Sequence, residues 1–363
     1  MPEFNSNTLA AQDIREIAGA RQRNTEARTP MRRSHLPVRI QLTELFRPED
    51  TRRIRLAAQV GVCHAIVDVR RVLSEVSPDR YLDVLRRIKL DFQDAGMEIV
   101  GVESHPVPAE KIKLGLKGRD MEIDQYFAAI KALREIGVSL VCYNWMAGLG
   151  WYRTDVNVKG RGGALISEFD LAVADRQGLT EWGEISEEVI WGNLEYFLKA
   201  VMPVAEQHGV KMALHPDDPP LSPLRGIGRI LTSANSFRRI LKLVPSPSNG
   251  ITFCQANFRL MGEDVAALVQ EWCAQKKIFF VHLRDVEGTR ERFRESFHDD
   301  TAVDLAQMMR IYHESGFEGP IRPDHAPTLE GEANDQPGYA MAGKLFAFGY
   351  MKGAMDALGI PYE

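Results

Sequence analysis

Long apolar runs, cysteine and surplus positive charge are all scarce in this sequence, and each shortage excludes a class of protein. No run approaches the ~18 apolar residues that a membrane-spanning helix needs, and the N-terminal residues lack the apolar centre of a signal peptide. Lysine and arginine total 45 against 50 aspartate and glutamate residues, and the net charge of −5 gives no basic footprint for nucleic acid. We therefore expect a cytoplasmic protein that binds neither membranes nor nucleic acids.

The four cysteines are too few and too scattered to cross-link a chain of 363 residues. We expect reduced thiols at all of them: Cys63, Cys142, Cys254 and Cys273. Hydrophobic residues make up 44% of the chain, which is enough for a large core. The length suits one barrel of about 250 residues that carries insertions.

Two regions of different composition follow one another along the chain. Residues 1–36 are polar and rich in arginine, and we interpret them as an N-terminal arm that lies against the body of the protein or a partner subunit. Residues 37–363 form a single predicted domain, in which short apolar runs alternate with stretches of helical periodicity. The apolar runs predict strands over 38–42, 65–69, 98–104, 140–145, 211–217, 251–258, 279–286 and 320–326. The periodic stretches predict helices over 48–60, 79–95, 121–137, 186–208, 234–243, 262–276, 301–315 and 339–357.

Alternating strands and helices in this number predict an α/β fold, a closed (β/α)₈ TIM barrel with an N-terminal arm. A doubly wound open sheet is the alternative, but the turn after the first strand (residues 38–50) has none of the glycines of a phosphate-binding loop. Residues 147–185 form a long insertion after the fourth strand, on the face where barrel enzymes hold their active sites. Pro203 lies inside a predicted helix and should kink or break it near residue 202.

Four residues with metal-binding side chains lie in or at the ends of four successive predicted strands: His215, Cys254, His282 and Asp324. The carboxyl ends of parallel strands share one rim of a barrel, where inward-pointing side chains converge. Each residue alone is more often part of the core than a ligand, but four in equivalent positions indicate a metal site. Two imidazoles, a thiolate and a carboxylate suit a divalent transition metal; the thiolate suggests Zn²⁺, and open positions for substrate oxygens would favour Mn²⁺ or Fe²⁺.

Several polar residues flank these predicted ligands. Asp217 precedes a stiff proline-rich turn and is a candidate catalytic or supporting carboxylate, with a loop cap as the alternative. Arg284 and Arg322 are placed to clamp a substrate carboxylate, although a structural ion pair is the commoner fate of such residues. His325 is a candidate for proton transfer only if its strand has ended, because neighbouring residues of a strand point to opposite faces. Tyr339 opens the last helix, so that its phenol can reach back over the mouth of the barrel.

Other polar residues follow strands on the same rim and are candidate substrate contacts. Glu103 and His105 end the third strand, and Asn144 ends the fourth. Arg153 lies in the insertion after the fourth strand, and His298, with Glu295 near it, lies in the loop after the seventh.

Between about residues 95 and 357 the sequence resembles the metal-dependent D-mannonate dehydratases. The resemblance rests on LHPDDPP, ITFCQ, FVHLRD, RPDH, GYAMAGKLFAFGYMKG, VESHPVPAEKIKLGLKGRD and VCYNWMAGLGWYRTD. It implies a xylose-isomerase-like barrel that uses Mn²⁺ or Fe²⁺ to convert D-mannonate into 2-keto-3-deoxy-D-gluconate and water, a step of hexuronate catabolism. The metal ligands of that family fall on His215, Cys254, His282 and Asp324, and its acid/base residues on His325 and Tyr339.

The chain departs from this family's pattern in three places. Residues 256–258 (Ala-Asn-Phe) stand where the family has a small Gly-Ser pair, and Ala-Gly-Leu-Gly precedes Trp151 where a proline and an aspartate are expected. The first 90 residues show no match. Two other functions therefore stay open: a sugar or sugar-acid isomerase or epimerase that uses the same metal site, and a non-catalytic sugar-acid binding relative. In each case we expect a small sugar acid as ligand and a homo-oligomer.

Overall fold

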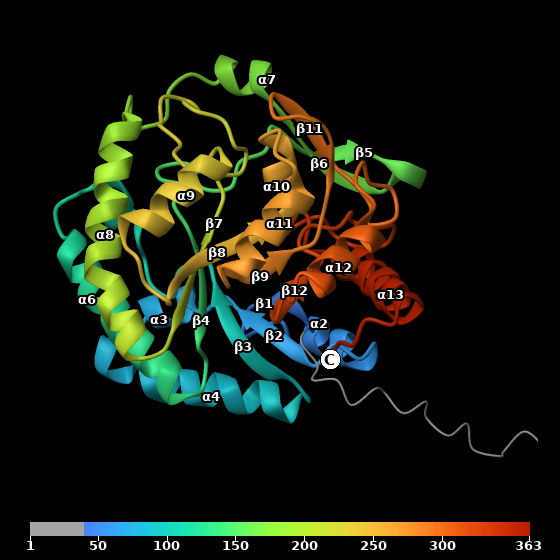
Figure 1. The fold of residues 1–363 in the computed structure, drawn as a ribbon, viewed down its shortest axis with the longest axis horizontal. Helices are drawn as coiled ribbons and strands as arrows, with labels where there is room; N and C mark the ends of the chain where they lie inside the picture. The colour runs from blue at the N-terminus through green and yellow to red at the C-terminus, as the bar shows by residue number, and fades with distance from the viewer. Residues whose placement is uncertain (1–39) are drawn as a thin grey trace, which may run out of the picture. The chain divides into compact units, whose positions relative to one another are not determined.

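Parallel strands close into a barrel in the computed structural model, which describes residues 40–363 (Figure 1). The order around the ring is β1-β12-β9-β8-β7-β4-β3-β2, and every neighbouring pair is parallel. Their bounds are β1 Ile40–Phe46, β2 His64–Val67, β3 Glu98–Glu103, β4 Leu140–Asn144, β7 Lys211–His215, β8 Asn249–Cys254, β9 Ile278–His282 and β12 Gly319–Arg322. The predicted TIM barrel is confirmed. The arm and its boundary with the barrel lie outside the described residues.

Most residues of the barrel strands are buried because both faces of the strands are covered. Every residue of β2, β8 and β9 is buried, with side chains filling the barrel on one face and helices packed on the other. The register places Cys254 beside His282, and His282 beside Arg322, on neighbouring strands. The ends of these strands therefore lie at the same height on the rim.

The helices that surround the barrel end where the sequence predicts. Gly96, Gly137 and Gly209 have φ angles of 79°, 84° and 63°, and each follows the last turn of a helix. No helix in residues 40–363 is long and apolar enough to cross a membrane. The helices are α2 Thr51–Gln59, α3 Arg70–Ser74, α4 Tyr81–Asp94, α5 Glu110–Leu114, α6 Arg119–Glu135, α7 Leu171–Arg176, α8 Glu187–Gln207, α9 Ala234–Leu243, α10 Gln255–Leu260, α11 Val265–Ala274, α12 Leu305–Glu314 and α13 Met341–Leu358.

Three predictions about single elements are corrected. The helix that contains Pro203 is not broken, because α8 runs without interruption from Glu187 to Gln207. The first strand continues to Phe46 instead of ending at residue 42, since it pairs with β2 over residues 43–46. The strand predicted over 251–258 ends at Cys254, where α10 begins. Cys254 thus lies on the rim, and Ala256, Asn257 and Phe258 belong to a short buried helix.

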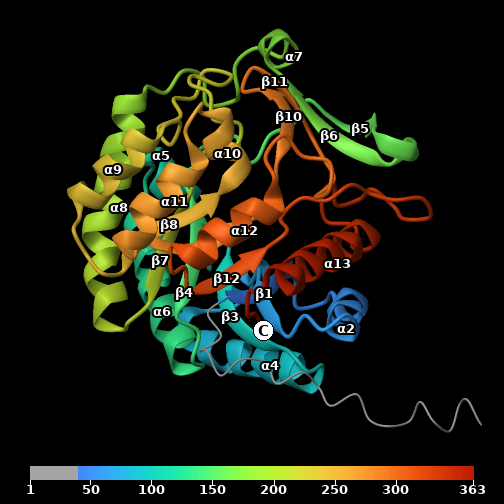
Figure 2. The same ribbon diagram turned by 45° about the vertical axis from the view of Figure 1, so that its right-hand side comes forward.

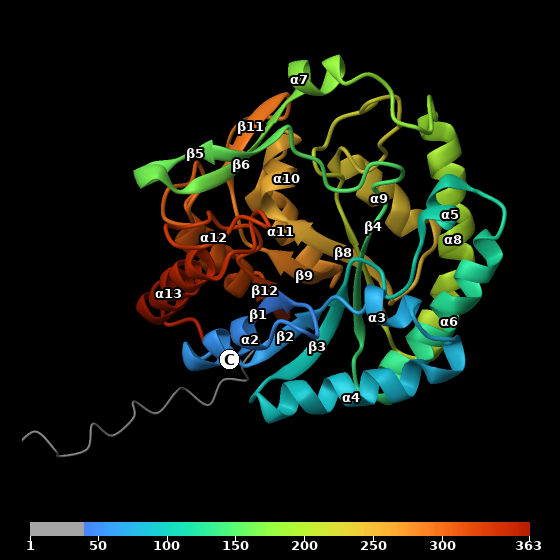
Figure 3. The ribbon, with the colours of Figure 1, turned by 180° about the vertical axis from the view of Figure 1, so that it is seen from behind.

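The two loops after β4 and β9 build a second, antiparallel sheet on the rim of the barrel. Its strands, in the order β10-β11-β6-β5, are Val286–Thr289, Arg292–Glu295, Leu165–Asp170 and Asp155–Lys159. This sheet and α7 lie at the end of the barrel opposite α4, as Figures 2 and 3 show from two sides. The insertion predicted over 147–185 therefore adds structure at the carboxyl ends of the barrel strands, where the candidate ligands are.

Candidate metal centre and active-site cavity

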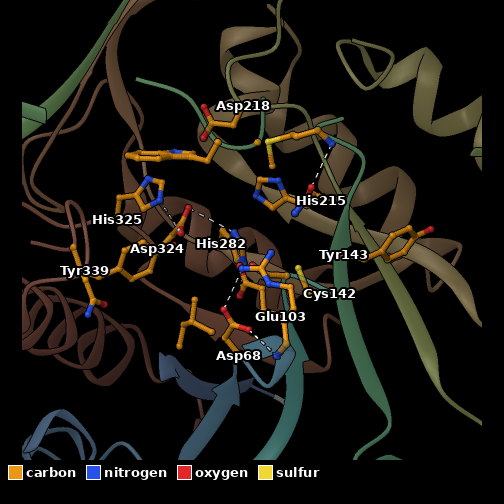
Figure 4. Close-up of a pocket in the computed structure, with 18 of the residues that line it drawn as sticks. Asp68, Glu103, Cys142, Tyr143, His215, Asp218, His282, Asp324, His325 and Tyr339 are labelled. Atoms are coloured by element: carbon orange, nitrogen blue, oxygen red, sulfur yellow. Dashed lines mark hydrogen bonds and ion pairs between the residues drawn. The ribbon is translucent and has the colours of Figure 1, made fainter. Parts of the chain in front are cut away.

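The four candidate ligands come from neighbouring strands of the ring, as predicted. His215, Cys254 and His282 are the last residues of β7, β8 and β9. Asp324 comes two residues after β12, where the chain turns with a φ of 56°. Figure 4 shows His215, His282 and Asp324 pointing toward one another across the bottom of a pocket. The barrel thus brings together four residues that are far apart in the sequence.

Three donor atoms of this cluster are close enough to share one ion, and a carboxylate oxygen of Asp324 lies near two of them. One donor atom each from His215, Cys254 and His282 lie within 4.8 Å of one another. Asp324 Oδ2 is 3.6 Å from His282 Nδ1 and 3.9 Å from Cys254 Sγ. His215 Nδ1 is engaged with the carbonyl of Pro216 at 2.7 Å, which leaves Nε2 as the available donor atom. Two nitrogens, a sulfur and a carboxylate oxygen form a typical donor set for a divalent transition metal.

Burial keeps both histidines of the cluster in the neutral form that can bind a metal. It lowers the pKa of His215 to about 4, and burial together with the charge of Arg322 lowers the pKa of His282. The Nδ1 atom of His282 is buried and has no hydrogen-bond partner within the described part of the chain. Burial raises the pKa of the Cys254 thiol to about 12, so metal binding would have to release its proton. A buried nitrogen without a partner, beside a thiol and a carboxylate, fits a metal ion.

A cavity of about 660 Å³ opens above this cluster, which is a usual size for a small-molecule site. Of the predicted residues, the following line it: Glu103, Asn144, His215, His282, Arg322, Asp324, His325 and Tyr339. The predicted residues that do not line it are His105, Arg153, Asp217, Cys254, Arg284 and His298. Cys254 nevertheless belongs to the ligand cluster at the bottom of the cavity.

His325 meets the condition set for a proton-transfer residue, because β12 has already ended at Arg322. Its Nδ1 lies 3.1 Å from Glu295 Oε1, and its ring packs edge-on against the ring of Tyr339 at 5.3 Å (Figure 4). Burial alone would raise the pKa of Glu295, but the charges of Arg284 and His325 outweigh burial and hold it at about 2. The carboxylate is therefore ionised and can orient the imidazole toward the cavity.

The buried arginines below the cavity bind carboxylates of the protein instead of facing a substrate. Arg284 contacts Asp218 at 2.7 Å, Glu295 at 3.0 Å and Asp324 at 2.6 Å. Arg153 also pairs with Asp218, at 2.6 Å, and with Glu295 at 2.7 Å. In this arrangement both arginines act as supports that fix the positions of carboxylates, and neither is open to a substrate.

Three further predicted residues have structural partners. Asp217 is fully buried, pairs with Arg229 at 3.3 Å and accepts a hydrogen bond from the backbone of Leu231, whereas its neighbour Asp218 faces the cavity. The ring nitrogens of His105 contact the Tyr126 hydroxyl at 3.2 Å and the Asn144 carbonyl at 2.7 Å. His298 contacts the carbonyl of Pro323 at 2.7 Å, next to the candidate ligand Asp324.

Among the lining residues that sequence reasoning missed, three bear on the chemistry of the cavity. Trp151 packs edge-on against His325 with ring centres 5.2 Å apart, and Asp68 and Lys113 add a carboxylate and an ammonium group to the lining. Asp68 could have been found, since it follows β2 directly, as the candidate ligands follow their strands. Lys113 lies on α5 and Trp151 in a loop, where no strand pattern marks them.

Comparison with known proteins finds, along most of the chain, the family that the sequence motifs resemble. The family model "D-mannonate dehydratase (UxuA)" matches residues 52–181 and 170–360. The match begins well before residue 90, so the expectation that the first 90 residues would show none is wrong from residue 52 onward.

Curated relatives and a solved structure agree with the family model. A mannonate dehydratase of Streptococcus agalactiae is 35% identical over 326 residues, covering 82% of this chain and 91% of the relative. Mannonate dehydratase 2 of Halalkalibacterium halodurans is 33% identical over 344 residues, covering 86% and 97%. The crystal structure of mannonate dehydratase from Streptococcus suis serotype 2 superposes with a TM-score of 0.78 at 28% identity, covering 89% and 97%.

More distant structures share the fold alone, among them a xylose isomerase domain protein from Alicyclobacillus acidocaldarius with a TM-score of 0.57 at 15% identity. The family model accounts for most of the described barrel, and the relatives exceed 30% identity over four fifths of the chain. The chain is therefore a member of the D-mannonate dehydratase (UxuA) family, a family of lyases.

Proposed function

We propose that the protein is a metal-dependent hydro-lyase that removes water from D-mannonate and yields 2-keto-3-deoxy-D-gluconate. The observation that carries this proposal is the placement of His325 and Tyr339 in the cavity that opens above the four candidate metal ligands. Family membership supports the reaction class, because relatives at 33–35% identity are named mannonate dehydratases. A small sugar acid fits a cavity of this size.

The proposed metal ligands are His215, Cys254, His282 and Asp324. A bound divalent ion would act as a Lewis acid that stabilises the enolate-like negative charge formed when the proton on C2 leaves. Mn²⁺ or Fe²⁺ is our proposal for the ion and Zn²⁺ the alternative, because the set mixes nitrogen, sulfur and oxygen donors.

The proposed acid and base are His325 and Tyr339. One of them takes the proton from C2, and the other donates a proton to the hydroxyl that leaves C3 as water. The resulting enol then gives the 2-keto-3-deoxy acid, so that the reaction consumes no other reagent. Glu295 would keep the imidazole of His325 aimed at the substrate, and Trp151 would shield it from solvent on one side. Burial raises the pKa of the Tyr339 hydroxyl, which therefore carries its proton at neutral pH.

The decisive experiment is metal analysis of the purified protein, followed by incubation of the metal-loaded protein with D-mannonate and identification of the product. We expect a bound divalent metal and a 2-keto-3-deoxy acid that forms only when metal is present. An epimerised acid or a ketose would contradict the dehydration. The Tyr339→Phe variant separates catalysis from binding: it should still bind D-mannonate but form about 100-fold less product per second. A homo-oligomeric state remains a prediction, which mass measurement in solution would check.

A further inference from the structure

Lys113 places a buried positive charge in the wall of the cavity. It lies on α5, lines the cavity and is only 7% exposed to solvent. Its Nζ donates a hydrogen bond to Asn144 Oδ1 at 3.1 Å. Within residues 40–363 it makes no ion pair: the carboxylate of Glu110, three residues earlier on α5 and also lining the cavity, acts on the ammonium group at longer range but does not contact it.

The other cationic side chains around the cavity are either paired or open to solvent. Arg322 contacts Glu103 at 2.7 Å and Asp324 at 2.9 Å, and Arg53 contacts Asp50 at 2.7 Å. Arg70 is half exposed and lies 3.6 Å from Asp68, and Arg47 is exposed. Of the buried cations that line the cavity in the described chain, Lys113 is therefore the one that lacks a carboxylate partner.

An unpaired buried ammonium is costly unless a ligand brings the opposite charge. Burial lowers the pKa of Lys113 to about 8, which still leaves most of it protonated at neutral pH. The side chain of Asn144 adds donors at the same place. Its Oδ1 accepts hydrogen bonds from Lys113 and from the backbone of Met146, so the N–H groups of its amide remain for a ligand. This part of the wall thus offers charge and donors to an anionic oxygen group.

The position of this wall suits the proposed reaction. β4, which ends at Asn144, lies four strands away from β12 in the ring of eight and hence on the opposite side of the mouth. Asn144 is also paired in register with His215 on the neighbouring strand. A group bound by Lys113 would therefore have the candidate metal ligands beside it and His325 across the cavity. Figure 4 shows His325 on the left and Tyr143, the neighbour of Asn144, on the right, with His215 and His282 between them.

We infer that Lys113 binds the carboxylate of the sugar acid, with the amide of Asn144 as a second donor, and that this contact makes the site prefer sugar acids to neutral sugars. The inference rests on the proposed function for the nature of the substrate. It assigns the carboxylate contact to a residue other than Arg284 and Arg322, whose charges are already balanced by carboxylates of the protein. An ammonium–carboxylate contact shielded from water is among the stronger polar interactions in proteins.

The test measures binding and does not depend on turnover. Lys113→Gln is made in the Tyr339→Phe background, loaded with metal, and titrated calorimetrically with D-mannonate and with D-mannitol, its neutral counterpart of equal length. Glutamine retains a donor for Asn144 but removes the charge. We expect D-mannonate to bind about 10- to 100-fold more weakly, D-mannitol binding to change less than about twofold, and metal content to remain unchanged.

Two further variants complete the experiment. Lys111→Met, on the same helix but outside the cavity, is the matched control and should leave both affinities unchanged. Asn144→Asp gives Lys113 a carboxylate partner inside the protein, and it should reduce the preference for the acid even if Lys113→Gln does not fold. A preference for D-mannonate that survives in Lys113→Gln and Asn144→Asp, or that the unsubstituted cavity lacks, would overturn the assignment. Acid binding that depends on Lys113, together with no 2-keto-3-deoxy product from the metal-loaded protein that retains Tyr339, would contradict the proposed reaction alone.

Discussion

The two halves of the barrel contribute different chemistry to one cavity. Strands β7, β8 and β9 and the segment after β12 supply the candidate metal ligands and the proposed proton-transfer residues. The loop after β2, the ends of β3 and β4, and helix α5 supply a wall of carboxylate, ammonium and amide groups: Asp68, Glu103, Lys113 and Asn144. We therefore expect a substitution among the residues of the later strands to reduce metal content or turnover. A substitution in the wall of the earlier strands should instead weaken substrate binding.

The largest effect, on both metal content and turnover, is expected when a candidate metal ligand is replaced. Replacing His282 with alanine removes a donor from the centre of the cluster, and we expect the protein to lose bound metal and about 1000-fold or more in turnover. Elemental analysis and the rate of 2-keto-3-deoxy acid formation measure the two losses. Asn144→Ala, on the wall, is the matched control and should retain the metal. The contrast between the halves would break down if the wall variant lost as much metal as His282→Ala.

We expect a smaller loss of turnover when Glu295, the carboxylate that positions His325, is replaced. Glu295→Gln keeps the shape of the side chain but weakens its hold on the imidazole, and we expect kcat to fall about 100-fold with metal content retained. Steady-state kinetics on metal-loaded protein measure this change. Glu287→Gln, in the exposed part of the same small sheet, serves as the control. Wild-type turnover in Glu295→Gln would mean that the carboxylate only supports the arginines beneath it.

The smallest effect on turnover is expected at Asp217, which the sequence suggested as a catalytic residue. Asp217→Asn leaves the buried guanidinium of Arg229 without a carboxylate, and we expect a loss of about 3 kcal/mol in the free energy of unfolding. Turnover of the folded protein should stay within about twofold of wild type. Urea denaturation and kinetics measure the two quantities, with the exposed Asp124→Asn as the control. A hundredfold loss of kcat at unchanged stability would restore the catalytic interpretation.

The difference between the halves also explains what the sequence could and could not reveal. The candidate ligands His215, Cys254 and His282 end their strands, and parallel strands in a barrel must end on one rim, so strand position was sufficient to predict that these side chains meet. Lys113 reaches the same cavity from a helix, through a path that depends on how α5 packs. No periodicity in the sequence encodes such a path.

The roles of the arginines were unpredictable for a related reason. Whether Arg284 faces a substrate or a protein carboxylate depends on Asp218 and Glu295, which come from loops after two different strands. Likewise, only the packing of the chain decides which of the adjacent Asp217 and Asp218 faces the cavity. Local sequence patterns therefore predicted the helices and strands and the end of the barrel at which the candidate ligands meet. Tertiary contacts decided which polar groups remain available for a ligand.

The contact between Lys344 and Glu44 can form only after nearly the whole chain has been synthesised. Lys344 on α13 donates a hydrogen bond to Glu44 of β1 at 2.9 Å and another to the backbone carbonyl of Asp324. The carboxylate of Glu44 must wait for a partner 300 residues away, which a ribosome adding about 5 to 20 residues per second delivers only after about 15 to 60 seconds. During that interval the nascent chain carries strands with open edges and no complete ligand set. Chaperones would therefore have a long period in which to act on it.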